Sequence, residues 1–431
     1  DFLRIEDDLQ EMAYLPDELL PLLPALPDQP QKTTLTPLSS DSAVDMVSSR
    51  SEILDEACIL LAALRFADPQ RYLSKTTTPS THWSMLEALL QGTGVLDQEK
   101  QPTELARKFL ELPRAQALSW LSSQWQNSSG FHETQFLPGL QIEPGSPVRS
   151  QSARQTIIGL LSLLQADIWY RLDDFIDLVK STEPDFLRHQ EEYFSWTILK
   201  DGNLQEPLSG YESWQQVEGV LITLIVLQIL PELALGETAA MKGVPTQRLF
   251  RLKEAFFHPA DSKQSQKAEP EDTPINLTST GKIVMTDRSS RLARYQISRF
   301  VDWVEVSPAS GTYQITPGSL AKAKDQGLLP KHLVQLLRKH AEGGLPPLLY
   351  EAIKRWEAEG TQASIQVHTI LRLSTPEMLQ ALRESPAAYW LGESLGPTTV
   401  IIKPTGEKAV LQALSSLGYL CDINESESNH A

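Results

Sequence analysis

The sequence of 431 residues contains only two cysteines, Cys58 and Cys421, which lie far apart. Isolated cysteines support neither a disulfide framework nor a zinc site, so we expect a reducing cytoplasm and no bound metal. The longest apolar run, Gly219–Leu230, is shorter than the ~18–20 residues of a membrane-spanning helix, and it predicts a buried helix instead. The acidic segment DFLRIEDDLQ differs from the basic start of a secretory signal.

The sequence motifs of common enzymes are also missing. There is no GxxxxGK[ST] loop to hold the phosphates of ATP, so we do not expect the chain to be a helicase motor. There is no HExxH motif, and no GxSxG or GxGxxG at a junction between a strand and a helix. The histidines are dispersed, and adjacent carboxylates such as Asp173 and Asp174 point to different sides of a helix. We therefore expect a non-enzymatic protein without a cofactor.

Positive charge is scarce as well. The net charge of −17 argues against a protein that binds nucleic acid over its whole surface. The charge is unevenly distributed, because residues 276–420 hold 16 Lys and Arg against 12 Asp and Glu, whereas the rest of the chain is strongly acidic. Two interpretations follow. Either a C-terminal domain faces DNA while an acidic body contacts protein, or the acidic surface only keeps an ordinary protein soluble.

Helix boundaries are clearest in Tyr313–Trp356, which begins with a strand ending in YQIT. Three short apolar-periodic segments follow, and each is expected to bury one face. Proline is favoured at the first helical position and glycine after the last, so these residues mark the helix limits. The expected helices run from Pro317 to Gly327, from Pro330 to Gly343, and from Pro346 to Trp356.

This order of one strand and three helices resembles the helicase-associated domain at the N-terminus of XPB-type helicases. Free-standing bacterial proteins carry the same domain, and a related module is the clutch of the TFIIH subunit that holds XPB. The resemblance extends more weakly over residues 274–420. Upstream, Trp214–Ala234 and Gln247–Phe256 resemble the winged-helix segments that precede this domain in the bacterial proteins. The resemblance implies an accessory protein of DNA transactions, with an XPB-like helicase as partner.

Helical patterns upstream of this domain favour two winged helices. The first begins with Ser51–Phe66, whose apolar stripe is clear, and the second includes helices at 155–165 and 211–229. The expected fold class is mainly α with α+β parts: tandem winged-helix-like domains plus a C-terminal α+β helicase-associated domain. The expected divisions are an N-terminal arm and linker (1–45), a winged-helix-like domain (46–145), a second one (146–257), a linker (258–274), the XPB N-terminal-like domain (275–423) and a tail (424–431).

Basic residues of the C-terminal domain are the candidate nucleic-acid-binding residues. If residues 288–299 are helical, four arginines share an arc of roughly 140° and could follow a phosphate backbone. The alternative is a solvated helix face that has no binding function. The candidates are Arg288, Arg291, Arg294 and Arg299, with Lys331, Arg338 and Lys339 as a second, weaker group.

The sequence therefore favours a non-enzymatic accessory or scaffold protein of an XPB-like DNA helicase, in repair or transcription, which binds the helicase and has DNA as a further candidate partner. One alternative is a winged-helix transcriptional regulator that binds specific DNA. Another is a pure protein-interaction scaffold, which the acidic body favours. The acidity of the winged-helix region argues against the regulator, because a recognition helix normally brings basic residues.

Overall fold

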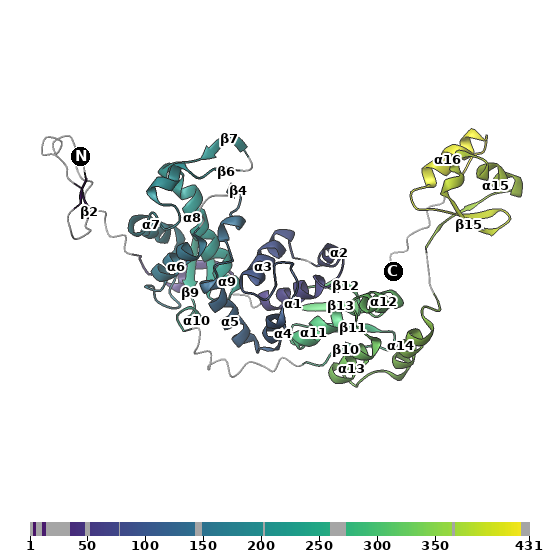
Figure 1. Ribbon diagram of the computed structural model, residues 1–431, viewed down its shortest axis with the longest axis horizontal. Helices are drawn as coiled ribbons and strands as arrows, with labels where there is room; N and C mark the ends of the chain where they lie inside the picture. The colour runs from purple at the N-terminus through teal and green to yellow at the C-terminus, as the bar shows by residue number, and fades with distance from the viewer. Residues whose placement is uncertain are drawn as a thin grey trace. The chain divides into compact units, whose positions relative to one another are not determined.

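A computed structural model describes residues 3–5, 11–13, 35–47, 52–76, 78–142, 149–200, 203–258, 273–363 and 367–423. The chain forms two compact units, Asp1–Ala358 (unit 1) and Glu359–Ala431 (unit 2), whose elements are labelled in Figure 1. About 49% of the chain is helix and 19% is strand, and the strands form several small antiparallel sheets. The fold is therefore mixed α+β.

The first part of unit 1 is helical. Helix α1 is the centre of this part, because all of its residues are buried and it packs against α2, α3, α5 and the more distant α11. In residues 52–76 and 78–139 the structure has two isolated bridges, Leu96 to Pro102 and Thr76 to Val306, and no strand of the hairpin that a first winged helix would contain. The helices are Ile53–Ala63 (α1), Pro69–Leu73 (α2), Ser80–Gly92 (α3), Glu104–Glu111 (α4) and Arg114–Asn127 (α5).

The second part of unit 1 combines helices with a four-stranded sheet of order β3-β8-β9-β5. Part of the expected N-terminal linker contributes the edge strand β3 of this sheet. A smaller sheet has the order β4-β6-β7. The helices are Ser150–Leu161 (α6), Leu172–Thr182 (α7), Trp214–Leu224 (α8), Leu230–Glu232 (α9) and Glu254–Phe257 (α10). The strands are Ala43–Val47 (β3), Leu140–Ile142 (β4), Tyr170–Arg171 (β5), Ile198–Lys200 (β6), Asn203–Leu208 (β7), Gly236–Met241 (β8) and Val244–Leu252 (β9), while Leu3–Ile5 (β1) pairs with Glu11–Ala13 (β2).

The long apolar helix passes Pro231 instead of ending before it. A π-helical turn, Ile225–Ile229, joins α8 to α9 and changes the hydrogen-bond pattern just before the proline, which has no N–H to donate. By length and composition Tyr211–Glu232 could cross a membrane, but 67% of its apolar window is buried. This is the placement of a core helix, as expected for the apolar run.

The third part of unit 1 contains the strand and three helices of the resemblance, and its sheet order is β10-β11-β13-β12. The expected helix starts are confirmed, and Thr316 caps α12 while Gly327 follows it with a positive φ that a glycine adopts without strain. Two ends differ from the expectation, because α13 ends at His340 and α14 continues to Glu359. Gly281, which also has a positive φ, lies in the turn of the β10–β11 hairpin. The elements are Asn276–Leu277 (β10), Lys282–Thr286 (β11), Arg291–Ser298 (α11), Asp302–Val306 (β12), Ser310–Gln314 (β13), Pro317–Asp325 (α12), Pro330–His340 (α13) and Pro347–Glu359 (α14).

Unit 2 is a three-stranded antiparallel sheet of order β14-β16-β15 with two α-helices and a 3₁₀ turn. The strands are Thr369–Arg372 (β14), Leu391–Gly396 (β15) and Thr399–Ile402 (β16), and the helical segments are Pro376–Arg383 (α15), Pro386–Trp390 (η8) and Glu407–Ser416 (α16).

The division between the units differs from the expected single domain 275–423. Leu349 and Ile353 of α14 belong to the same hydrophobic cluster as α1, whereas the buried residues of unit 2 form a cluster of their own. Residues 273–358 thus share one core with the N-terminal helices. Most of the expected linker, 258–274, and the tail, 424–431, lie outside the described residues.

Candidate functional site

The two central arginines of the expected DNA-binding face are buried. Arg291 and Arg294, on α11, are each 1% exposed. The Nη1 atom of Arg294 lies 2.5 Å from Oδ1 of Asp55 on α1, and the same carboxylate pairs with Arg114 of α5. Arg291 donates to the backbone carbonyl of Leu112. Neither guanidinium reaches solvent, so the expected arginine face is not a surface in this structure.

The reason lies in the packing of α11. This helix contacts α1, α4 and α13, and the arc that carries its arginines is the side that faces α1. A sequence signal for this existed in Asp55, because it lies in a mostly apolar helix and a carboxylate that is buried there needs a cationic partner. A helical arc of arginines alone does not distinguish an outer face from an inner one.

The other two arginines of this group lie at the ends of α11. Arg288 precedes the helix and is exposed. Arg299 follows it and is partly buried, with its Nε donating to Oε1 of Gln326 at 3.2 Å and its guanidinium 5.5 Å from the ring centre of Tyr295. The four arginines therefore do not form one continuous face.

The second basic group is on the surface. Lys331, Arg338 and Lys339 of α13 are all exposed. The guanidinium of Arg338 lies 5.0 Å from the ring centre of Tyr350 on α14, which supports its position by a cation–π contact. Of the two predicted basic groups, this weaker one alone keeps its three cationic side chains at the surface.

Burial also affects the chemistry beside the arginine cluster. The thiol of Cys58 is 2% exposed and donates to the backbone carbonyl of Arg291 at 3.3 Å. Burial raises its pKa to about 11, although Arg294 acts in the opposite direction. The thiolate is the reactive form of cysteine, so Cys58 is an inert core residue at neutral pH.

A separate, acidic pocket of about 900 Å³ lies where the starts of α1 and α3 meet the α8–α9 helix. Its charged lining residues are Glu52, Glu56, Glu232 and His82. Nε2 of His82 lies 2.8 Å from a carboxylate oxygen of Glu56, and Nδ1 lies 3.5 Å from one of Glu232. Both ring nitrogens face carboxylates, so the imidazole joins three helices.

The charge of His82 follows from these partners. Burial lowers its pKa, but the hydrogen bonds of Glu232 and Glu56 outweigh burial and raise the pKa to about 10. The imidazole is therefore a cation at neutral pH, which is the wrong state for a general base. Within the described residues, no group of three or more His, Cys, Asp or Glu side chains is arranged to hold a metal ion.

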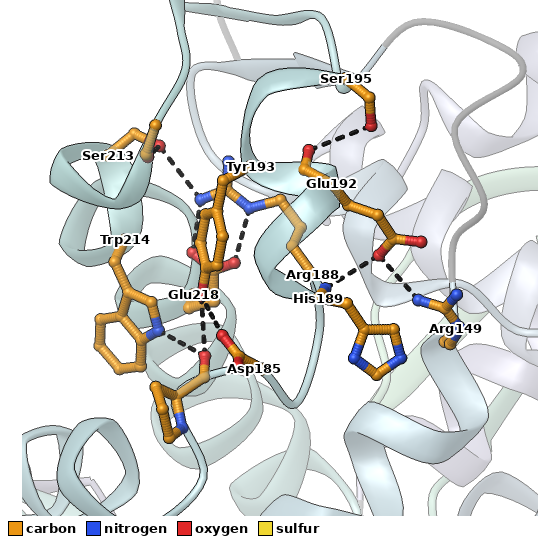
Figure 2. Close-up of polar contacts among 12 residues, drawn as sticks. Arg149, Asp185, Arg188, His189, Glu192, Tyr193, Ser195, Ser213, Trp214 and Glu218 are labelled. Atoms are coloured by element: carbon orange, nitrogen blue, oxygen red, sulfur yellow. Dashed lines mark hydrogen bonds and ion pairs between the residues drawn. The ribbon is translucent and has the colours of Figure 1, made fainter. Parts of the chain in front are cut away.

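A third polar cluster surrounds Arg188 in the loop after α7 (Figure 2). The guanidinium is fully buried, and its Nε and Nη2 atoms each lie 2.7 Å from an oxygen of Glu218 on α8. Nη2 also lies 3.1 Å from Oγ of Ser213, and the ring of Tyr193 stacks 4.7 Å from the guanidinium. Sequence analysis identified none of these residues, because a single arginine in a loop gives no periodic signal.

Comparison with known proteins adds no family assignment. No protein-family model matches this chain, and a search of the curated proteins finds no match.

Proposed function

We propose that this chain is a non-enzymatic accessory protein of an XPB-like DNA helicase, acting in the cytoplasm in bacterial DNA repair or transcription. The order of β13, α12, α13 and α14, with proline and glycine at the expected helix limits, carries the proposal. It is the same order that gives the sequence its resemblance to the helicase-associated domain. The strong negative charge outside residues 276–420 favours protein contact over nucleic-acid contact for the rest of the chain.

The order of elements in the second part of unit 1 supports a winged helix in that part. The elements α6, β5, α7, α8, β8 and β9 occur in this order, with β6 and β7 between α7 and α8. They provide three helices, a first strand and a terminal hairpin, and β5 pairs with β9. In such a fold, α8 would take the place of the recognition helix. Most of α8 is buried within unit 1, which argues against the alternative of a regulator that reads specific DNA with this helix.

The partner is tested directly with purified proteins. An XPB-like helicase from the same organism should co-elute with this chain in size-exclusion chromatography, and the chain should change the DNA-dependent ATPase rate of the helicase. This chain alone should hydrolyse no ATP, since it has no phosphate-binding loop. Separate elution of the two proteins at micromolar concentration would overturn the helicase partnership, and ATP turnover that survives repurification would overturn the non-enzymatic role.

Contact with DNA is a second part of the proposal, and the exposed group on α13 supports it. Replacing Lys331, Arg338 and Lys339 with Ala should weaken DNA binding for all sequences alike, because phosphate contacts carry no sequence information. The slope of log K against log salt should flatten by about 0.9 for each phosphate of duplex DNA that the variant no longer neutralises. An unchanged slope would place any DNA contact elsewhere, and no binding by the wild type at low salt would favour the pure scaffold.

A further inference from the structure

The loop that follows α7 is held by a buried charge and two backbone ties. Arg188 belongs to this loop, and its side chain is buried in an ion pair with Glu218 of α8, as Figure 2 shows. The carbonyl oxygen of Pro184 lies 2.8 Å from the indole nitrogen of Trp214 and 3.0 Å from the hydroxyl of Tyr193. Burying an ion pair costs desolvation energy, so this one is better explained by the geometry that it fixes than by added stability.

An aromatic pocket lies beside this loop and is lined in part by its residues. The pocket has a volume of about 420 Å³ and is lined by Pro184, Asp185, Tyr193, Phe194 and Tyr211. Phe194 is 80% exposed and Tyr211 is 46% exposed, and both line the same pocket, so their rings are grouped at the surface. The rings of Tyr193 and Tyr211 are nearly perpendicular, with centres 5.4 Å apart.

The chemistry of this pocket suits a cation. The carboxylate of Asp185 lies 3.2 Å from the hydroxyl of Tyr193 and brings a negative charge to the pocket lining. Ring faces in this region already attract cations, because the ammonium of Lys180 lies 5.4 Å from the ring centre of Tyr211. Lys180 does not line the pocket.

We propose that this aromatic pocket binds an arginine side chain of a partner protein. The planar guanidinium stacks on Phe194 and Tyr211 and pairs with the carboxylate of Asp185, a combination that a lysine ammonium matches less well. The inference rests on the proposed function in one respect, namely that the acidic body of this chain contacts protein. Arg188 and Glu218 act as positioning residues, because they fix the loop and do not line the pocket.

The test uses the full chain and a fluorescent Gly/Ser peptide with one central arginine, with affinity measured by fluorescence anisotropy. Phe194→Ala and Asp185→Asn should each weaken binding by about fivefold or more, since each removes one of the two attractive contacts. Matched controls are Leu163→Ala, which removes another exposed apolar side chain, and Glu183→Gln, which removes a nearby carboxylate outside the pocket. Both controls should bind as the wild type does.

Lys180→Met gives a result that structural damage would not imitate. It removes a positive charge beside Tyr211 and keeps the length of the side chain, so affinity for the peptide should rise. Equal binding of peptides with lysine or proline in place of arginine would overturn the inference. So would free arginine that binds more tightly than the peptide, because the ligand would then be a small molecule. Loss of peptide binding in the variants with unchanged helicase co-elution separates this pocket from the helicase contact.

Discussion

The two units of this protein build their cores from different materials. Unit 1 buries three arginine–carboxylate pairs, Arg294–Asp55, Arg154–Glu133 and Arg188–Glu218, in which the arginines are 0–1% exposed. Among the described residues of unit 2, no polar or charged side chain is buried, and its core consists of nine apolar residues.

The difference concerns how the units are specified. An apolar core tolerates many arrangements, whereas a buried ion pair is stable only when both partners and their hydrogen bonds are in place. The Asp55 cluster takes its residues from α1, α5 and α11, which are far apart in the sequence. In unit 1, both the pairing of buried charges and the close packing of apolar side chains therefore select the native arrangement. In unit 2, the packing of apolar side chains alone selects it.

The largest expected effect is on isolated fragments. Residues 359–431 contain a complete core and should show a cooperative thermal transition by circular dichroism. Residues 273–358 alone should not fold, because removing α1 and α5 leaves Arg294 without its carboxylate and exposes the face of α11 that packs on α1. A folded 273–358 fragment would contradict the shared core, and a disordered 359–431 fragment would contradict the independence of unit 2.

The second-largest expected effect is the loss of stability that a single substitution causes in unit 1. Asp55→Ala leaves two buried or partly buried guanidinium groups without their shared carboxylate, and breaking a buried pair in this way costs about 3–5 kcal/mol. Denaturant unfolding followed by tryptophan fluorescence should report this destabilisation in unit 1. The control is Glu393→Ala, at an exposed position of β15, which should change stability by less than about 0.5 kcal/mol. An Asp55→Ala effect below about 1 kcal/mol would mean that the buried pairs are not what distinguishes unit 1.

The smallest effect is a pH dependence confined to unit 1. The pKa of His82 is about 10 in the folded chain against an ordinary value of 6.5, so its contribution to stability is complete below pH 6.5 and is lost as pH rises towards 10. Between pH 7 and 9 the unfolding free energy of unit 1 should fall by roughly 1–3 kcal/mol. His82→Gln should remove most of this slope and leave the transition of unit 2 unchanged. A wild-type slope that persists in the variant would assign the effect to another group.

The exposed basic residues of α13 lie on the side of the helix that its apolar periodicity leaves to solvent. Lys331, Arg338 and Lys339 lie on the polar side of an amphipathic helix, and the periodicity of Leu333 and Leu337 sets which side faces the core. Helix α11 has no comparable apolar stripe to show which side its arginines occupy, because it is short and has neighbours on several sides.

The sequence by itself determined most helix limits, because capping residues, prolines and glycines act through local backbone geometry. Pro317, Pro330 and Pro376 each open a helix, and Gly327 and Gly418 each follow one with positive φ. Only the tertiary structure decided which charged residues are inside. The pairing of Asp55 with Arg294 spans 239 positions of the chain, and the loop that presents Phe194 is fixed from α8 through Glu218. Such contacts depend on which elements come together in the folded chain, and the local pattern of residues does not show which distant element will supply the partner.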